Sequence, residues 1–193
     1  MRNTAANPSK RVLRIHHRFR TQRLDRAQLR RHLRHALENH LHRPVYELSV
    51  HFIGDAEMRR LNERFARHAG TTDVLTFDYS DYDLPNRPAP APDRRRTRRT
   101  RTKASPGGAA LRGECFICVP EAVRQAPRYG VAWQTEVTRY AIHGLLHLCG
   151  WNDDTASERR TMKSLENRLV RVLTRRAPTA RSSPAKNQLH RRP

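Results

Sequence analysis

The amino-acid sequence predicts an α+β protein, in which a single domain holds a mixed sheet of about four strands and four to five helices around one central helix. Three observations predict this class. Apolar and polar residues alternate strictly over residues 46–52, as in a strand with one buried face. Residues 131–149 form a long, largely apolar segment with helical periodicity. The chain of 193 residues is long enough for one domain plus tails.

The first half of the chain predicts strands that alternate with helices. Apolar residues at 12, 13 and 15 favour a first strand, and those from Leu29 to Leu37 stand at helical spacing. The strand over 46–52 comes next. Asp55 can cap the following helix, whose apolar side chains recur at intervals of three and four. The segment DVLTFDY at residues 73–79 then predicts another strand.

A long irregular segment separates this half from the next one. Residues 80–112 are rich in proline and then in arginine, with no apolar periodicity, which indicates an insertion. A strand is predicted at 115–119. The central helix over 131–149 ends where Gly150 permits a left-handed turn. Thr155 and Glu158 form a capping box that opens a last helix. We therefore expect a flexible N-terminus at 1–10, a body at 11–172 and a disordered basic tail at 173–193.

The formal net charge of +21 is unevenly distributed along the chain. Residues 1–40 carry +9, residues 94–103 carry +7 and residues 171–193 carry +7, so everything else together carries −2. The basicity is therefore concentrated in these three segments, and the rest of the chain is close to neutral. Basic arms attract nucleic acids because they neutralise phosphates and release counterions. The alternative is that these segments are solvated and contact nothing specific.

Cysteine content and hydropathy favour a cytoplasmic protein that does not cross a membrane. Three cysteines argue against a disulfide framework and fit a reducing compartment. No apolar run reaches the ~20 residues that span a bilayer, and no signal segment opens the sequence. Cys115 and Cys118 form a C-x-x-C pattern, but residues three apart on a strand point to opposite faces. We therefore expect them to pack in the core and not to chelate a metal together.

The candidate chemistry lies in HGLLHLCGWND, at residues 143–153. His143 and His147 stand one helical turn apart, with Cβ atoms about 6 Å from each other on one face. Gly150 then lets the chain turn back, so that Asp153 can supply an oxygen ligand. Three protein ligands leave a position open for water, which is the catalytic arrangement of zinc. Asp154 is a nearby carboxylate that could orient one of the ligands.

An H-x-x-x-H pattern alone often means only two polar residues near a surface. Here the helix around the pair is otherwise apolar, so the two histidines would be buried without an obvious partner. The glycine and the acid also follow at a spacing that closes a three-ligand site. The sequence therefore favours a hydrolytic metal site over a structural pair of histidines.

Three segments together resemble one known family. HGLLHLCGWND agrees with the signature H-G-x-L-H-L-x-G-[YW]-D-H at all but the last two positions. Upstream, LNERFARHAGTTDVLTFDY is similar to a stretch LN…R…P-T-D/N-V-L-S-F, and GECFICVPE is similar to a strand that begins G-D-I. These are the motifs of the YbeY family of endoribonucleases, also called rRNA maturation factors. The resemblance covers most of residues 45–172 in the same order, with 80–112 as an insertion.

The resemblance implies a metal-dependent endoribonuclease that is specific for single strands, acting in 16S rRNA 3′ end maturation and in ribosome quality control. It implies one Zn²⁺ per chain, held by His143, His147 and Asp153, and it makes both histidines catalytic. The implied partners are single-stranded rRNA and the small ribosomal subunit. The oligomeric state stays open.

The chain departs from the family pattern at two positions. Asp153 replaces the third histidine, and an anionic ligand would make bound water less acidic and favour harder ions such as Mn²⁺. The arginine that the family places after LN…[YF] falls on Ala66, and we expect the neighbouring Arg67 to take its catalytic role. Thr72 and Asp73 match the family's T-D step. Glu114 is expected either to face the active-site cleft or to cap its strand.

Two other functions compete with this one. The ligand spacing is also that of metzincin peptidases, but those enzymes need a glutamate as general base where this chain has Gly144. The other alternative is a non-catalytic, ribosome-associated RNA-binding factor whose metal only stabilises the fold.

Overall fold

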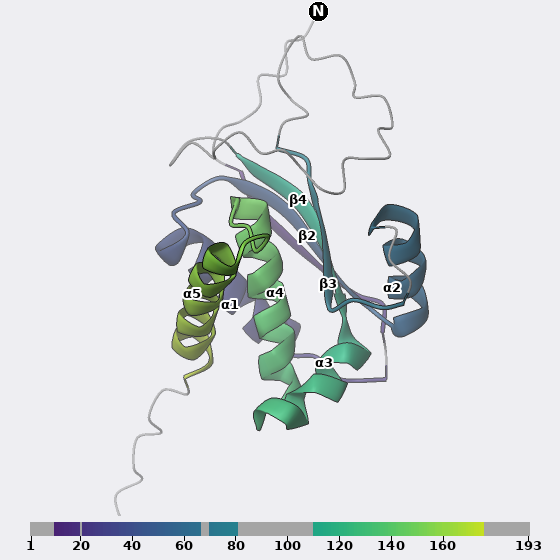
Figure 1. Cartoon of the computed structure of the whole chain (residues 1–193). Helices are drawn as coiled ribbons and strands as arrows, with labels where there is room; N and C mark the ends of the chain where they lie inside the picture. Colours follow the sequence, from purple (N-terminus) through teal and green to yellow (C-terminus); the bar gives the residue numbers. More distant parts are fainter. Residues whose placement is uncertain (1–9, 20, 67–69, 81–109, 176–193) are drawn as a thin grey trace, which may run out of the picture.

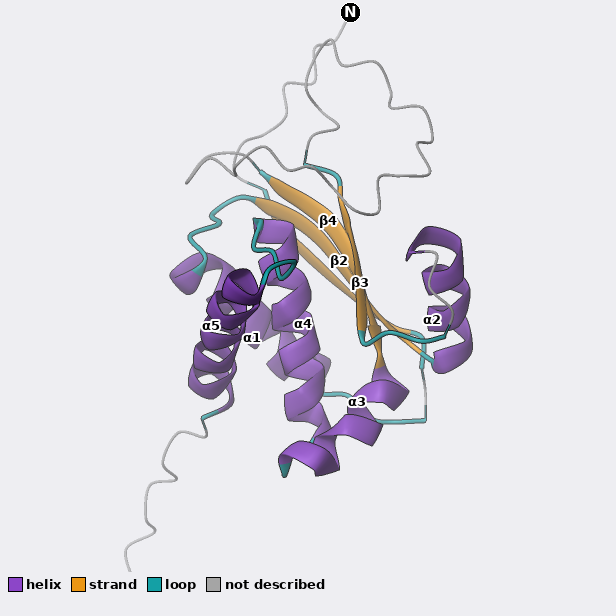
Figure 2. Ribbon diagram, viewed as in Figure 1, coloured by secondary structure: helices purple, strands orange, loops and turns teal. Residues whose placement is uncertain are grey.

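The computed structural model describes residues 10–19, 21–66, 70–80 and 110–175. Arg67, the core of the basic insertion and most of the basic tail lie outside these residues. One four-stranded sheet forms the centre of the molecule (Figure 1). Helices α1, α4 and α5 lie on one side of this sheet, and α2 lies on the other (Figure 2).

The sequence folds into strands and helices in the predicted alternation, with three short helical turns labelled η. In chain order the elements are β1 (Arg11–His17), α1 (Arg26–His35), η1 (Ala36–His40), β2 (Tyr46–Ile53), α2 (Asp55–Leu61), η2 (Asn62–Ala66), β3 (Val74–Asp78), β4 (Leu111–Cys118), α3 (Val119–Gln125), η3 (Ala126–Tyr129), α4 (Trp133–Cys149) and α5 (Ala156–Thr174).

The sheet is mixed, as predicted, with the strand order β1-β2-β4-β3. β1, β2 and β4 run parallel, and β3 runs antiparallel to β4 at the edge. The register places Val50, Cys115 and Thr76 side by side on three neighbouring strands. Because successive side chains alternate between the faces of a sheet, these three lie on the face that α4 covers.

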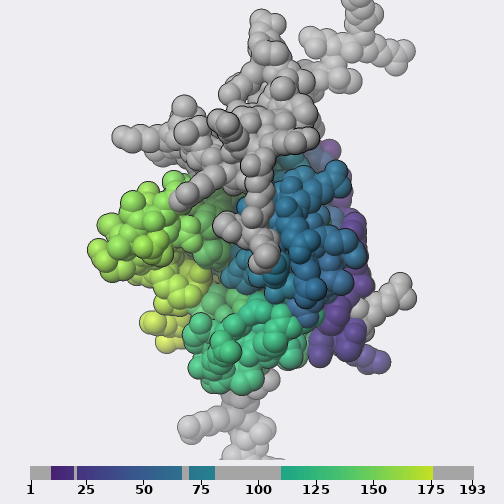
Figure 3. All heavy atoms as spheres, turned by 45° about the vertical axis from the view of Figure 1, so that its right-hand side comes forward, coloured from purple at the N-terminus to yellow at the C-terminus, as the bar shows by residue number. Residues whose placement is uncertain are grey.

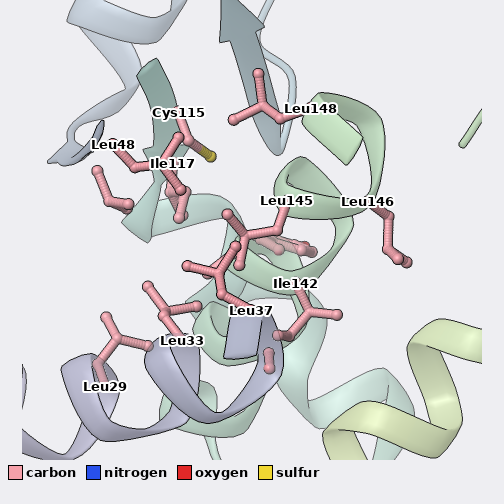
Figure 4. Packing of buried hydrophobic residues seen from close by; sticks show 14 of the residues in the cluster. Leu29, Leu33, Leu37, Leu48, Cys115, Ile117, Ile142, Leu145, Leu146 and Leu148 are labelled. Atoms are coloured by element: carbon pink, nitrogen blue, oxygen red, sulfur yellow. The ribbon is translucent and has the colours of Figure 1, made fainter. Parts of the chain in front are cut away.

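The main core lies between this face of the sheet and α1, α4 and α5. The strictly alternating residues of β2, from Tyr46 to Phe52, are buried on the core side as predicted. Figure 4 shows Leu33 of α1 and Ile142 and Leu145 of α4 in the same cluster as Ile117 of β4. Burying this apolar surface fixes α4 against the sheet.

A smaller cluster holds α2 on the opposite face of the sheet. It contains Ile53, Met58 and Cys118, all fully buried. Cys115 instead belongs to the main core. This confirms the prediction that Cys115 and Cys118 point to opposite faces and pack separately, and both thiols are free.

Several predicted boundaries differ from the structure. Gly54, not Asp55, is the residue before α2, because the Asp55 carboxylate pairs with Arg124 at 2.7 Å instead of capping the helix. β4 begins at Leu111, four residues before its predicted start, because its pairing with β2 continues as far as the pair of Leu111 with Tyr46. Arg112 and Glu114 interrupt the apolar pattern there and hid the strand. The central helix begins at Trp133, because η3 and a left-handed Gly130 occupy the preceding residues.

The predicted capping box of α5 is present. The Thr155 hydroxyl accepts from the Glu158 N–H at 3.2 Å, and the Glu158 carboxylate accepts from the Thr155 N–H at 2.9 Å. Among the helices in the described part of the chain, none combines the length and the apolarity that a bilayer span requires.

Candidate metal centre

His143 and His147 face each other on α4. The helix places them one turn apart, and both side chains are half-buried. Their Nε2 atoms are 3.0 Å apart, and the ring planes are nearly perpendicular, at 86°. Both Nε2 atoms therefore point to one location beside the helix.

Gly150 ends α4 in a way that orients His147. Its φ of 102° lies in the left-handed region, and the Trp151 N–H donates back to the Leu146 carbonyl at 3.0 Å. This turn brings the Trp151 carbonyl to 3.1 Å from His147 Nδ1. Because a carbonyl can only accept a hydrogen bond, Nδ1 carries the proton and Nε2 of the neutral ring keeps its lone pair.

Glu166 of α5 orients His143 in the same way. Its Oε2 lies 3.0 Å from His143 Nδ1, and its Oε1 accepts from Arg139 at 2.8 Å and from Lys163 at 2.7 Å. Burial by itself raises the pKa of Glu166, but the hydrogen bonds from His143, Lys163 and Arg139 outweigh it and bring the pKa to about 2. The carboxylate is therefore ionised at neutral pH, so His143 Nδ1 is the donor and its Nε2 is available as a ligand.

Two Nε2 lone pairs at 3.0 Å repel each other unless they share a cation. Burial, followed by the nearby His143, lowers the pKa of His147, which favours the neutral ring that binds metals. Nitrogen ligands about 2.0–2.1 Å from a tetrahedral Zn²⁺ stand about 3.3 Å apart, close to the separation in this structure. The pair of imidazoles is therefore suited to a metal ion.

Asp153 completes the group. One ligand atom from each of His143, His147 and Asp153 lies within 4.8 Å of the other two. The Arg159 guanidinium fixes the loop that carries this aspartate, because it donates to the Asp153 and Asp154 carbonyls, each at 2.8 Å. The structure thus brings together the three side chains that the sequence predicts as ligands. Arg67, the fourth predicted site residue, lies outside the described residues.

Two of these side chains, His143 and Asp153, line an open cleft of about 590 Å³. Figure 3 shows a face of the molecule on which the segments around residues 55–66, 115–130 and 150–160 are visible in their own colours. The described lining contains more carboxylates than cations. The acids are Asp73, Glu121, Glu136, Asp153 and Glu166, and the cations are Arg139, Arg159 and Lys163. A bound divalent cation would offset this excess of negative charge.

Glu166, which was not predicted as a site residue, has the orienting role that was predicted for Asp154. The carboxylate that contacts a ligand histidine is that of Glu166, whereas the Asp154 side chain is exposed and its carbonyl receives Arg159. The sequence contains a signal for this role of Glu166. It follows Met162 by four residues and so lies on the inner face of α5, where an acid needs a partner.

The structure also places the other residues that the sequence singles out around the site. Thr72 and Asp73 line the cleft, and the Thr72 hydroxyl donates to the Asp73 carboxylate at 3.0 Å. Glu114 neither faces the cleft nor caps β4. Its carboxylate lies on the far face of the sheet, where it accepts from the Tyr79 hydroxyl at 3.1 Å. Gly144 faces the sheet, where a Cβ atom would lie 2.6 Å from Cys115 Sγ. A glutamate there would not reach the cleft.

The chain is similar to several known proteins. The family model described as endoribonuclease YbeY matches residues 14–174. An endoribonuclease YbeY of Moorella thermoacetica is 34% identical over 124 residues, which are 64% of this chain and 70% of that protein. One of Thermobifida fusca is 35% identical over 144 residues, which are 75% of this chain and 81% of that protein. A solution structure from Thermotoga maritima covers 84% of this chain and 89% of its own, with 19% identity and a TM-score of 0.49. The family match extends over most of the sequence, so the chain belongs to the endoribonuclease YbeY family.

Proposed function

We propose that this protein is a metal-dependent endoribonuclease that cleaves single-stranded RNA during rRNA maturation. The observation that carries this proposal is the convergence of His143, His147 and Asp153 on one point at the edge of an open cleft. Membership of the endoribonuclease YbeY family selects RNA as the substrate. The same membership supports the finer proposals of 16S rRNA 3′ end maturation, ribosome quality control and association with the small ribosomal subunit.

A divalent ion in this site would polarise a phosphodiester oxygen and lower the pKa of a water molecule near it. The protein contributes the orientation of the ligands. The ionised Glu166 and the Trp151 carbonyl keep both Nδ1 atoms protonated, so that both Nε2 atoms face the same point. Zn²⁺ suits two imidazoles and one carboxylate, and the carboxylate of Asp153 also makes Mn²⁺ a candidate.

Electrostatics suggest how the substrate is held. The described lining of the cleft has five carboxylates and three cations, and a divalent ion would bring it close to neutrality. Long-range attraction for RNA would then come mainly from the basic segments at 1–40, 94–103 and 171–193, which carry +9, +7 and +7. We further propose that Arg67 contacts the substrate phosphate, on the strength of its place in the family motif.

The two alternatives gain less support. A metzincin-like peptidase needs a general base after the first histidine, and the position of Gly144 against the sheet leaves no room for one. A non-catalytic RNA-binding factor would not need an open coordination position in a cleft. Three ligands at an accessible site favour catalysis.

The test compares His147→Ala with the matched control His35→Ala, which changes an exposed histidine of α1. We expect the His147 variant to melt near the wild-type temperature of metal-free protein and to bind a single-stranded RNA oligonucleotide, but to lose cleavage. The control should cleave normally. A chelator should abolish wild-type cleavage, and Zn²⁺ or Mn²⁺ should restore it. Cleavage that survives both the His147 substitution and the chelator would refute the proposal, and digestion of casein would instead support the peptidase.

A further inference from the structure

Tyr129 is an exposed aromatic residue within the candidate cleft. Its relative exposure is 63%, the highest of the large hydrophobic residues in the described ranges. The same side chain lines the cleft that contains His143 and Asp153. Aromatic side chains normally bury most of their surface in a fold, so a ring left open to a substrate cleft calls for an explanation.

A rigid turn supports this ring. Tyr129 ends η3, in which Ala126 is buried and Pro127 fixes the backbone. Gly130 follows with a φ of 61°, and its N–H donates to the Pro127 carbonyl at 3.2 Å. The Val131 N–H then donates to the Ala126 carbonyl at 3.1 Å. The backbone that carries Tyr129 is therefore held in place before any ligand arrives, which lowers the entropic cost of binding.

The charges of the cleft favour a contact to bases over a contact to phosphates near this ring. Tyr129 lies on the side of the cleft formed by α3 and the start of α4. Two acids from these helices, Glu121 and Glu136, also line the cleft there. Arg139, the cation of the lining on α4, is engaged with Glu136 at 3.1 Å and with Glu166 at 2.8 Å. A ring surface attracts a nucleobase without requiring a free cation.

We propose that Tyr129 is a stacking platform for one nucleobase of the single-stranded RNA substrate. This inference rests on the proposed endoribonuclease function and specifies how the cleft holds its substrate.

The proposal also gives a physical reason for single-strand specificity. Bases in a duplex are stacked on their neighbours and paired, so none can offer a free face to Tyr129. A single strand can turn one base out against the ring.

The experiment uses the full chain and four variants. Tyr129→Ala removes the ring, Tyr129→Leu keeps apolar bulk without aromatic faces, and Tyr129→Phe keeps the ring. Val172→Ala is the control, because it truncates an exposed apolar residue of α5 outside the cleft lining. Each protein is tested for binding to a labelled single-stranded RNA oligonucleotide in the presence of a chelator, and for kcat/KM with Zn²⁺. A series of oligonucleotides carries one abasic nucleotide at each successive position.

We expect Tyr129→Ala to weaken binding about 5- to 150-fold, the usual range for the loss of one stacked base. Tyr129→Phe and Val172→Ala should resemble the wild type, and Tyr129→Leu should lie near the alanine variant. The loss of binding in Tyr129→Ala should match its loss of kcat/KM with Zn²⁺. It should vanish for the oligonucleotide that is abasic at the contacted position, because the wild type then has no base to stack. A defect of equal size on every abasic oligonucleotide, a leucine variant as good as the wild type, or unchanged binding by the alanine variant would each overturn the proposal. If the wild type binds RNA but never cleaves it, the proposed function fails, while the binding series still decides the role of Tyr129.

Discussion

Replacing Gly144 by alanine tests how closely α4 must approach the sheet to form the metal centre. A Cβ atom at this position would meet Cys115 Sγ at 2.6 Å, Val74 Cγ2 at 3.1 Å and Thr76 Cγ2 at 3.2 Å. Ordinary contacts between non-bonded carbons are about 3.5–4.0 Å, so all three neighbours would have to move. Cys115 is fully buried and has a short side chain, which leaves it little room to do so.

The expected loss of stability is about 2 kcal/mol. Overpacking of a close-packed core costs about 1–3 kcal/mol, and the upper end applies here because three neighbours, among them the fully buried Cys115, are affected. Alanine has a higher helix propensity than glycine, which returns about 1 kcal/mol. A net loss of about 2 kcal/mol lowers the melting temperature by roughly 4–8 °C in a domain of this size. Since Gly144 lies between His143 and His147 in the sequence, a displaced helix should also weaken zinc binding.

Urea denaturation of metal-free protein measures the stability, and competition with a chelating dye measures the zinc affinity. Cys115→Ala is the matched partner, because it removes the atom in closest conflict with the new Cβ. We expect the double variant to be more stable than the sum of the two single effects predicts, by at least about 1 kcal/mol. Additive effects, or a Gly144→Ala protein that gains the helix-propensity stabilisation in full, would refute the argument from close approach.

Burial, together with the hydrogen bond to Glu38, raises the pKa of Tyr46 from 10.0 to about 12, so the neutral phenol contributes up to about 3 kcal/mol below pH 10. That stability should disappear as the pH rises from 10 to 12, and urea denaturation of Tyr46→Phe should show no such loss. Glu166→Gln should weaken zinc binding about 10- to 100-fold, because it removes the charge that orients His143. The control Glu121→Gln changes a cleft acid away from the ligand histidines and should bind zinc normally. Asp153→His should raise the ratio of zinc-dependent to manganese-dependent cleavage, and an unchanged ratio would count against an anionic ligand at this position.

The sequence predicted the elements whose signals are local. The alternation of Tyr46 to Phe52, the Thr155–Glu158 capping box and the turn at Gly150 are all present, because each depends on residues close together in the chain. The mixed sheet followed from the number and type of these elements. The spacing of the two histidines on a helix was likewise a local property.

Features that depend on partners distant in sequence were not predictable in this way. The start of β4 is set by its pairing with β2, about 65 residues earlier in the chain, and the pattern of Leu111 to Glu114 alone does not reveal it. Asp55 was expected to cap α2, but Arg124 competes for its carboxylate. Glu166 needed the packing of α5 against α4, since only that contact brings the carboxylate to His143.

The arrangement of charges around His143 explains how one acid can orient a ligand without lowering the charge of the site. Glu166 is close enough to the metal centre to matter electrostatically, but Arg139 and Lys163 both donate to its Oε1. Its Oε2 remains for His143 Nδ1. The two cations thus compensate the carboxylate, and the hydrogen bond fixes the ring with little added negative charge near a bound ion. Asp153 is then the principal anionic contribution to that ion, so any departure of this chain from a three-histidine site in metal preference should originate at that one position.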